Sequence, residues 1–72
     1  MKQFNPEFII KFLIHNGWII DHTTGSHKIM YNENSKKRTV VPFHKKDLPI
    51  GTLLAILKQT GLTKQNLLDF KK

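Results

Sequence analysis

The chain has 72 residues, of which 39% are hydrophobic and 24% charged, and it contains no cysteine. A chain of this length accommodates one small domain, and its composition is typical of a folded globular protein. The absence of cysteine excludes disulfides and thiolate metal sites, and it suits a reducing cytoplasm. We therefore expect one cytoplasmic domain over residues 1–72.

Twelve Lys and Arg residues against five Asp and Glu give a formal net charge of +7. Such a charge attracts polyanions, and it favours nucleic acid over an anionic membrane or an acidic protein. Lys11 interrupts the apolar N-terminal stretch, which has no cleavage site for a signal peptide. This stretch is also shorter than the roughly 20 residues that span a bilayer. We expect no membrane partner.

The first predicted helix runs from about Pro6 to Asn16. Asn5 can cap its start, proline suits its first position, and Gly17 is a natural residue just beyond its end. The side chains expected to face the core recur at helical spacing, and they are Phe8, Ile9, Phe12 and Leu13. Ile10 and Ile14 widen this apolar stripe beyond what one small sheet needs.

Three short strands are predicted next, over residues 18–23, 27–32 and 38–43. The first two are rich in β-branched and aromatic residues and flank a turn that contains Gly25 and Ser26. A polar, charged segment separates the second strand from the third. This spacing predicts a three-stranded antiparallel meander.

The strand pattern leaves one question of orientation open. Ile29 and Tyr31 share one face of the second strand and Met30 lies on the other, so the pattern does not decide which face is buried. Pro42 cannot donate a hydrogen bond to a central ladder, and we expect it at a strand end or an edge.

A basic connection over residues 44–49 leads into a second predicted helix over residues 50–60, which Gly61 ends. Thr63 then caps a last short helical turn. The residues expected to face the core are Leu53, Leu54 and Leu57, followed by Leu67, Leu68 and Phe70. The fold class is therefore α+β, a two-layer α-β-β-β-α sandwich with helices on one sheet face and a C-terminal helical extension.

Three stretches carry a resemblance to a known family: "NGW" at 16–18, "GSHKIM" at 25–30 and "TVVPFHKKDLPIGTLLAILKQTGL" at 39–62. In this order and spacing, the chain resembles the HicA-type toxins of bacterial toxin–antitoxin systems, small ribonucleases that cut mRNA. The resemblance implies a fold like that of double-stranded-RNA-binding domains. It also implies an mRNA substrate, no cofactor and a HicB-type antitoxin partner. We expect a monomer when free and a hetero-oligomer with the antitoxin.

The resemblance identifies His27, in the Gly-Ser-His motif, as the catalytic residue. RNA carries its own nucleophile, the 2′-hydroxyl, so the protein has only to move protons and stabilise phosphate charge. Histidine, with an unperturbed pKa of about 6.5, suits proton transfer near neutral pH. Gly25 allows close approach of backbone N–H groups to a phosphate, and Ser26 adds a hydroxyl donor. Without the resemblance, His27 is more simply an exposed residue at a strand end.

Three other histidines have weaker indications. His44 resembles a less fixed position of the family, where it would transfer the second proton, bind phosphate or have no role. His15 lies late in the first helix, where the helix dipole favours a capping role. His22 has no evident task. The histidines lack metal-ligand spacing and acidic residues are few, so we expect no metal site.

Basic residues cluster in the second hairpin and after the third strand. If the Gly25 turn and the His44 connection share one end of the sheet, His27, His44, Lys45 and Lys46 come together there. Each lysine is otherwise a solvated surface charge. The residues expected to bind RNA phosphates are Lys28, Lys36, Lys37, Arg38, Lys45 and Lys46.

Ile10 and Ile14, if exposed, form an apolar patch of the kind that marks a protein interface, here for the antitoxin. Two other functions compete with the ribonuclease. A catalytically silent RNA-binding module would keep the basic stretches but has no reason to present the Gly-Ser-His turn. A DNA-binding regulator is disfavoured because the second helix carries only Lys58 as a cation.

Overall fold

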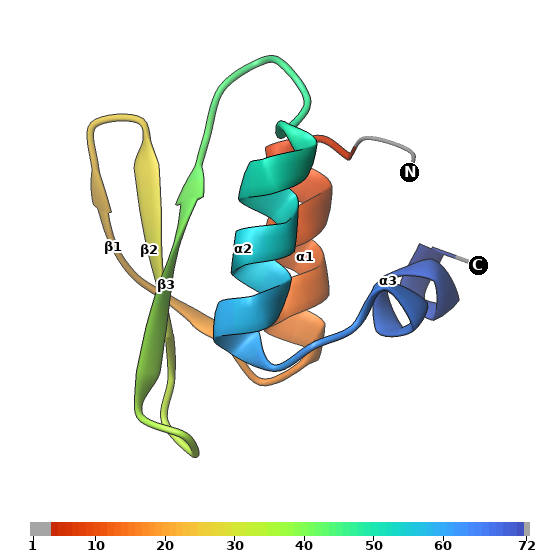
Figure 1. Cartoon of the computed structure of the whole chain (residues 1–72). Coiled ribbons are helices and arrows are strands. Elements are labelled where there is room, and N and C mark those ends of the chain that lie inside the picture. The colour runs from red at the N-terminus through yellow and green to blue at the C-terminus, as the bar shows by residue number, and fades with distance from the viewer. Residues whose placement is uncertain (1–3, 72) are drawn as a thin grey trace.

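The computed structural model describes residues 4–71, and their helices and strands follow the predicted order (Figure 1). The elements are α1 (Pro6–His15), β1 (Ile19–Thr24), β2 (His27–Asn32), β3 (Lys37–Pro42), α2 (Ile50–Thr60) and α3 (Lys64–Lys71). The three strands form one antiparallel sheet in the order β1-β2-β3. The predicted α+β class and the α-β-β-β-α order are confirmed.

The predicted helix signals act as expected. The Asn5 side chain accepts a hydrogen bond of 2.8 Å from the backbone N–H of Phe8 and so caps α1. Asn16 is the C-cap of α1 rather than its last residue, and Gly17 follows with φ of 90°. Gly61 ends α2 in the left-handed conformation, with φ of 75°. Local capping chemistry therefore sets the helix ends.

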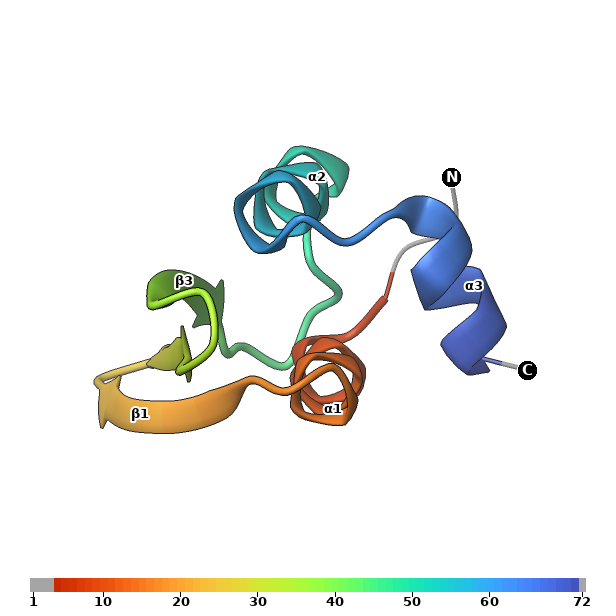
Figure 2. The ribbon, with the colours of Figure 1, turned by 90° about the horizontal axis from the view of Figure 1, so that it is seen from below.

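The sheet resolves the open question about β2. Met30 pairs with Thr39 and Lys28 pairs with Val41, and paired residues share a face. Met30, Thr39 and Val41 are buried, so this face packs against the helices, which we call the inner face. No helix formed by residues 4–71 lies on the outer face (Figure 2).

The strand bounds differ slightly from the prediction. β1 and β3 are each shifted by one residue, and Trp18, expected in the first strand, precedes β1 and is buried in the core. Pro42 is the last residue of β3, an edge strand, as expected. All six residues of β1 are exposed, and the register shifts at Asp21. The helices therefore cover β2 and β3 but leave β1 outside the core.

The molecule has a third layer that the two-layer prediction missed. Figure 2 shows α1 and α2 on one side of the sheet and α3 on the far side of these helices. The centroid of the Phe70 ring in α3 lies 5.4 Å from the ring centroid of Phe8 and 5.6 Å from the ring centroid of Phe12. The C-terminal extension is thus an eight-residue helix packed on α1, longer than the short helical turn that was predicted.

Two reciprocal hydrogen bonds cap the N-terminus of α3. Thr63 Oγ1 accepts from the backbone N–H of Asn66 at 3.0 Å, and Asn66 Oδ1 accepts from the backbone N–H of Thr63 at 2.9 Å. Leu67 is fully buried, but Leu68 is 47% exposed and does not face the core as predicted. In α2, Leu54 is likewise exposed, although it was predicted to face the core. Ile56 lies in the core in place of Leu54. Residues 53, 56 and 57 share one face of the helix, whereas residue 54 is turned away.

The predicted patch of Ile10 and Ile14 is wrong for one of its two members. Ile10 is 6% exposed and belongs to the core, whereas Ile14 is 50% exposed. Because α1 lies between the sheet and α3, more of its circumference is covered than a two-layer sandwich requires. The wide apolar stripe of α1 therefore marks a middle-layer helix.

No helix within residues 4–71 is long and apolar enough to cross a membrane.

Candidate functional site

The turn between β1 and β2 places His27 at one end of the sheet. Thr24 pairs with His27, so Gly25 and Ser26 form a two-residue turn. Gly25 has φ of 56°, which glycine adopts readily and other residues rarely do. No heavy atom lies within 4 Å of the position a Cβ would take on Gly25, so conformation rather than space favours glycine there.

The connection after β3 starts at the same end. His27 pairs with Pro42, and the backbone N–H of Phe43 donates to the Ser26 carbonyl at 2.6 Å. The Gly25 turn and the His44 connection are therefore held side by side, as Figure 1 shows at the top of the sheet. The shared end predicted for these segments is present.

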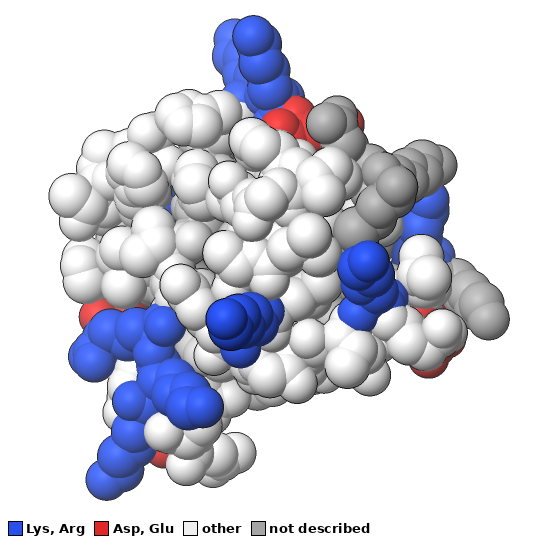
Figure 3. Space-filling view, in the orientation of Figure 1, with Lys and Arg blue, Asp and Glu red and all other residues white. Residues whose placement is uncertain are grey.

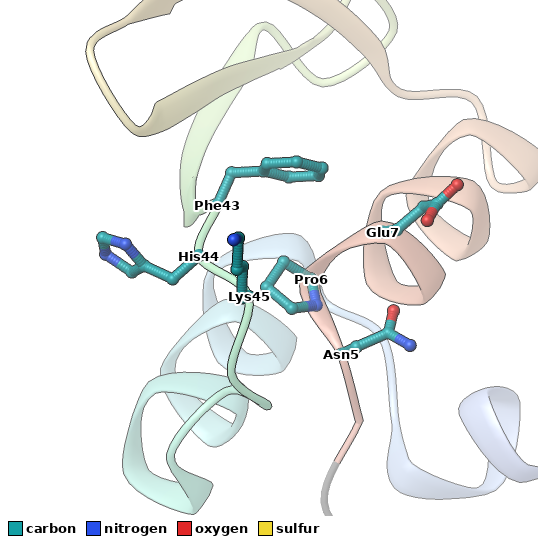
Figure 4. Close-up of a pocket in the computed structure, with 6 residues that line it drawn as sticks. All are labelled: Asn5, Pro6, Glu7, Phe43, His44 and Lys45. Carbon is teal, nitrogen blue, oxygen red and sulfur yellow. The ribbon is translucent and has the colours of Figure 1, made fainter.

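The two imidazoles nevertheless line different hollows. His27 shares the outer face with its pairing partner Pro42, and it lines a hollow of about 420 Å³ between β3 and α2. His44 lines a separate open hollow of about 320 Å³ beside the N-terminus of α1. In Figure 4 the Phe43 ring points toward α1, whereas the His44 ring points to the opposite side of the connection. The backbone segments therefore come together, while His27 and His44 line these two separate hollows.

Lys28 lies on the inner face, opposite to the face of His27. Its Nζ lies 5.0 Å from the centroid of the Phe43 ring and 3.4 Å from Thr23 Oγ1. A cation over a ring face at this distance is a cation–π contact. Lys28 therefore helps to hold the end of the connection, and it projects away from the outer face.

The basic residues of the β2–β3 hairpin lie at the end of the sheet opposite to the Gly25 turn. Asn32 Oδ1 accepts from the backbone N–H groups of Asn34 and Ser35 at 2.9 and 3.1 Å, which builds the β2–β3 turn. Lys36 follows with φ of 58° and donates its N–H to the Asn32 carbonyl. Figure 3 shows the Lys and Arg side chains over this turn at the lower left and another group at the top, over the loop before α2.

Arg38 lines a groove between β3 and α2 that was not predicted from the sequence. Its guanidinium lies 4.6 Å from the centroid of the Tyr31 ring. Arg38, Ala55 and Gln59 line the hollow that contains His27, and they also line a neighbouring hollow of about 590 Å³ with Lys37 and Lys58. The two hollows therefore adjoin. We call the combined feature, lined by His27, Lys37, Arg38, Thr39, Val40, Pro42, Thr52, Ala55, Ile56, Lys58 and Gln59, the β3–α2 groove.

A partly buried hydrogen bond connects the two walls of this groove. Thr39 Oγ1 donates to Gln59 Oε1 at 2.6 Å, and Thr39 is 2% exposed. The amide N–H groups of Gln59 stay available as donors. A signal for this wall was present in the sequence, because Thr52, Ala55 and Gln59 recur at helical spacing and are small or polar.

The remaining histidines lie elsewhere. His22 Nδ1 lies 2.8 Å from Asp21 Oδ2 on the exposed strand β1. The His15 ring, in the last turn of α1, lies 5.1 Å from the centroid of the Phe70 ring. Within the described part of the chain, no three His, Cys, Asp or Glu side chains gather as metal ligands would.

The family model for the HicA toxin of bacterial toxin–antitoxin systems matches residues 8–62. This match spans most of α1, the whole sheet and α2, and it includes both the Gly25 turn and the β3–α2 groove. No curated protein matches the chain. Since the match covers well over half of the 72 residues, the chain belongs to the HicA toxin family of bacterial toxin–antitoxin systems.

Proposed function

We propose that this toxin is a metal-independent endoribonuclease that cuts mRNA and uses His27 for proton transfer. The observation that supports the proposal is the exposure of His27 beside the Gly25-Ser26 turn, at one end of a groove that also contains Arg38. A histidine in this place is accessible to a phosphodiester, and the cation supplies charge to hold it. Membership of the HicA family agrees with this assignment.

The proposed reaction uses a nucleophile that belongs to the RNA. The 2′-oxygen loses its proton and forms a bond to phosphorus, and the bond from phosphorus to the 5′-oxygen breaks. The 5′-oxygen takes up a proton, and the other product is a 2′,3′-cyclic phosphate. His27 transfers one of these protons as general base or general acid. Backbone N–H groups at Gly25 and the Ser26 hydroxyl stabilise the phosphate charge.

His44 is the proposed second proton-transfer group, or a phosphate ligand beside Lys45 and Lys46. All three residues are exposed at the end of the sheet where the Gly25 turn lies. Because the ring of His44 lines a different hollow from that of His27, a proton-transfer role requires the RNA to bridge the two hollows. The remaining proposed phosphate ligands are Lys28, Lys36, Lys37 and Arg38.

The toxin family implies an antitoxin partner, and we propose that it is of the HicB type and covers His27. An acidic surface on the antitoxin would use the same positive field that attracts RNA. Ile14, half exposed on α1, is the proposed apolar contact, whereas buried Ile10 takes no part.

The function is tested by incubating purified protein with RNA in the presence and absence of EDTA. We expect cleavage that EDTA leaves unchanged and that His27→Ala abolishes. His22→Ala is the matched control, because it removes another exposed histidine from the same sheet. Cleavage that EDTA stops would refute the metal-independent mechanism. RNA binding without cleavage would instead identify a silent RNA-binding module.

A further inference from the structure

The end of the β3–α2 groove farthest from His27 is strongly basic. Lys37, Arg38 and Lys58 come from two different elements, β3 and α2, and line the same hollow. None of the described residues that line the groove is acidic. The three cations therefore face the groove without a carboxylate among its lining residues to neutralise them, which suits an anionic ligand.

The walls of the groove are held in place before any ligand binds. The Arg38 guanidinium stacks on Tyr31, which limits the freedom of its long side chain. The Thr39–Gln59 hydrogen bond ties α2 to β3 between the His27 end and the Lys58 end. A site whose arginine and walls are already ordered loses less entropy when it binds its ligand.

The length of the groove suits a short stretch of a nucleic acid strand. β3 has six residues and spans about 20 Å at roughly 3.3 Å per residue. At a spacing of about 3.4 Å per stacked nucleotide, this length accommodates about six nucleotides. Small and polar side chains line part of the groove: Ala55 lines both hollows, and Thr52 lines the hollow that contains His27. Bases can lie against this part while phosphates contact the basic end.

We propose that a single RNA strand lies along the β3–α2 groove, with Lys58 and Arg38 binding its phosphates a few nucleotides from the bond that His27 cleaves. The position of the cleaved bond rests on the proposed function, but the binding track does not. Lys58 is thereby assigned a role in binding the substrate. α1 adds no comparable basic surface, because its Lys11 is paired with Glu7 at 3.7 Å. The cations of the groove, Lys37, Arg38 and Lys58, line one hollow, which matches one strand better than the two backbones of a duplex.

The test measures binding of an eight-nucleotide 2′-fluoro oligoribonucleotide, which lacks the 2′-hydroxyl nucleophile and cannot be cleaved by the proposed route. Fluorescence anisotropy gives the Kd at several salt concentrations. We expect Lys58→Ala to weaken binding by about three- to ten-fold, as expected for loss of one charge-assisted contact. It should also reduce the slope of log K against log salt by about 0.7, the value for one phosphate on a single strand.

Lys64→Ala is the matched control, because it removes another exposed lysine, the first residue of α3, which does not line the groove. We expect it to change the affinity by less than about two-fold and to leave the salt slope unchanged, because it loses no phosphate contact. Lys58→Arg should retain the affinity, and both alanine variants should melt as the parent does, because both side chains are exposed. Equal effects of Lys58→Ala and Lys64→Ala would overturn the proposal, and so would a duplex of the same sequence that binds as tightly as the single strand.

The two proposals fail separately. If RNA is never cleaved but Lys58→Ala selectively weakens binding, the ribonuclease is refuted and the groove stands. If RNA is cleaved but the two lysine variants behave alike, the groove is refuted and the ribonuclease stands.

Discussion

Leu67→Ala tests whether α3 is an integral part of the core, although it lies beyond the residues that match the family. Leu67 is fully buried, and alanine there removes apolar contact and leaves a cavity. Such substitutions cost about 2–5 kcal/mol. Because α3 is short and can shift toward the gap, we expect the lower part of this range, about 2–3 kcal/mol. For a domain of this size, that loss lowers Tm by about 10–20 °C.

The chain contains a natural probe for this measurement. Trp18 is its single tryptophan and is 2% exposed, so its fluorescence reports on the core during urea unfolding. We expect the urea midpoint to fall while the slope of the free energy of unfolding against urea stays unchanged. A lower slope would indicate that the variant has lost two-state unfolding or that its unfolded state has changed.

Leu68→Ala is the control, because the same substitution is made one residue away at a side chain that is 47% exposed. We expect a change within about 0.5 kcal/mol, as is usual at the surface. If Leu67→Ala and Leu68→Ala destabilise the protein equally, the packing described for α3 is wrong.

Three further outcomes are expected. Asn5→Ala removes the cap of α1 and should cost about 1 kcal/mol in the same urea assay, whereas Asn5→Gly should cost only a few tenths; equal losses would contradict the capping role. Gly25→Ala places a side chain at φ of 56° and should cost about 1–2 kcal/mol, so an unchanged urea midpoint would contradict a left-handed conformation at residue 25. Ile14→Lys should weaken antitoxin binding, measured by calorimetry, without changing RNA cleavage, whereas Ile10→Lys buries a charge and should lower Tm strongly. Unchanged antitoxin affinity for Ile14→Lys would exclude that contact.

Much of the fold could be predicted because its signals are local. The Asn5 cap and the Gly61 end act within a few residues, and the bounds of α2 agree with the prediction in full. The burial of Met30 could not be predicted, since both faces of β2 carry apolar side chains and only the position of the helices decides between them. The exposure of β1 also depends on how far the helices reach across the sheet.

The incorrect predictions of burial share a physical cause. Hydrophobic periodicity describes each helix or strand separately and does not show how the elements pack on one another. The proposed patch depended on the exposure of Ile10, but Ile10 is buried, on the side of α1 opposite to Phe8 and Phe12, which contact α3. The candidate site shows the same limit. The shared end of the Gly25 turn and the His44 connection follows from strand order, but the approach of Lys58 to Arg38 depends on how α2 packs on β3.

The rate of cleavage of one oligoribonucleotide, compared between the parent protein and His27→Ala under single-turnover conditions, tests the proposed function most directly. We expect the rate to fall by about 10²–10⁴-fold, the usual contribution of general acid–base catalysis. The products of the parent protein should carry a 2′,3′-cyclic phosphate and a 5′-hydroxyl. Cleavage by His27→Ala at the rate of the parent protein would contradict the role assigned to His27.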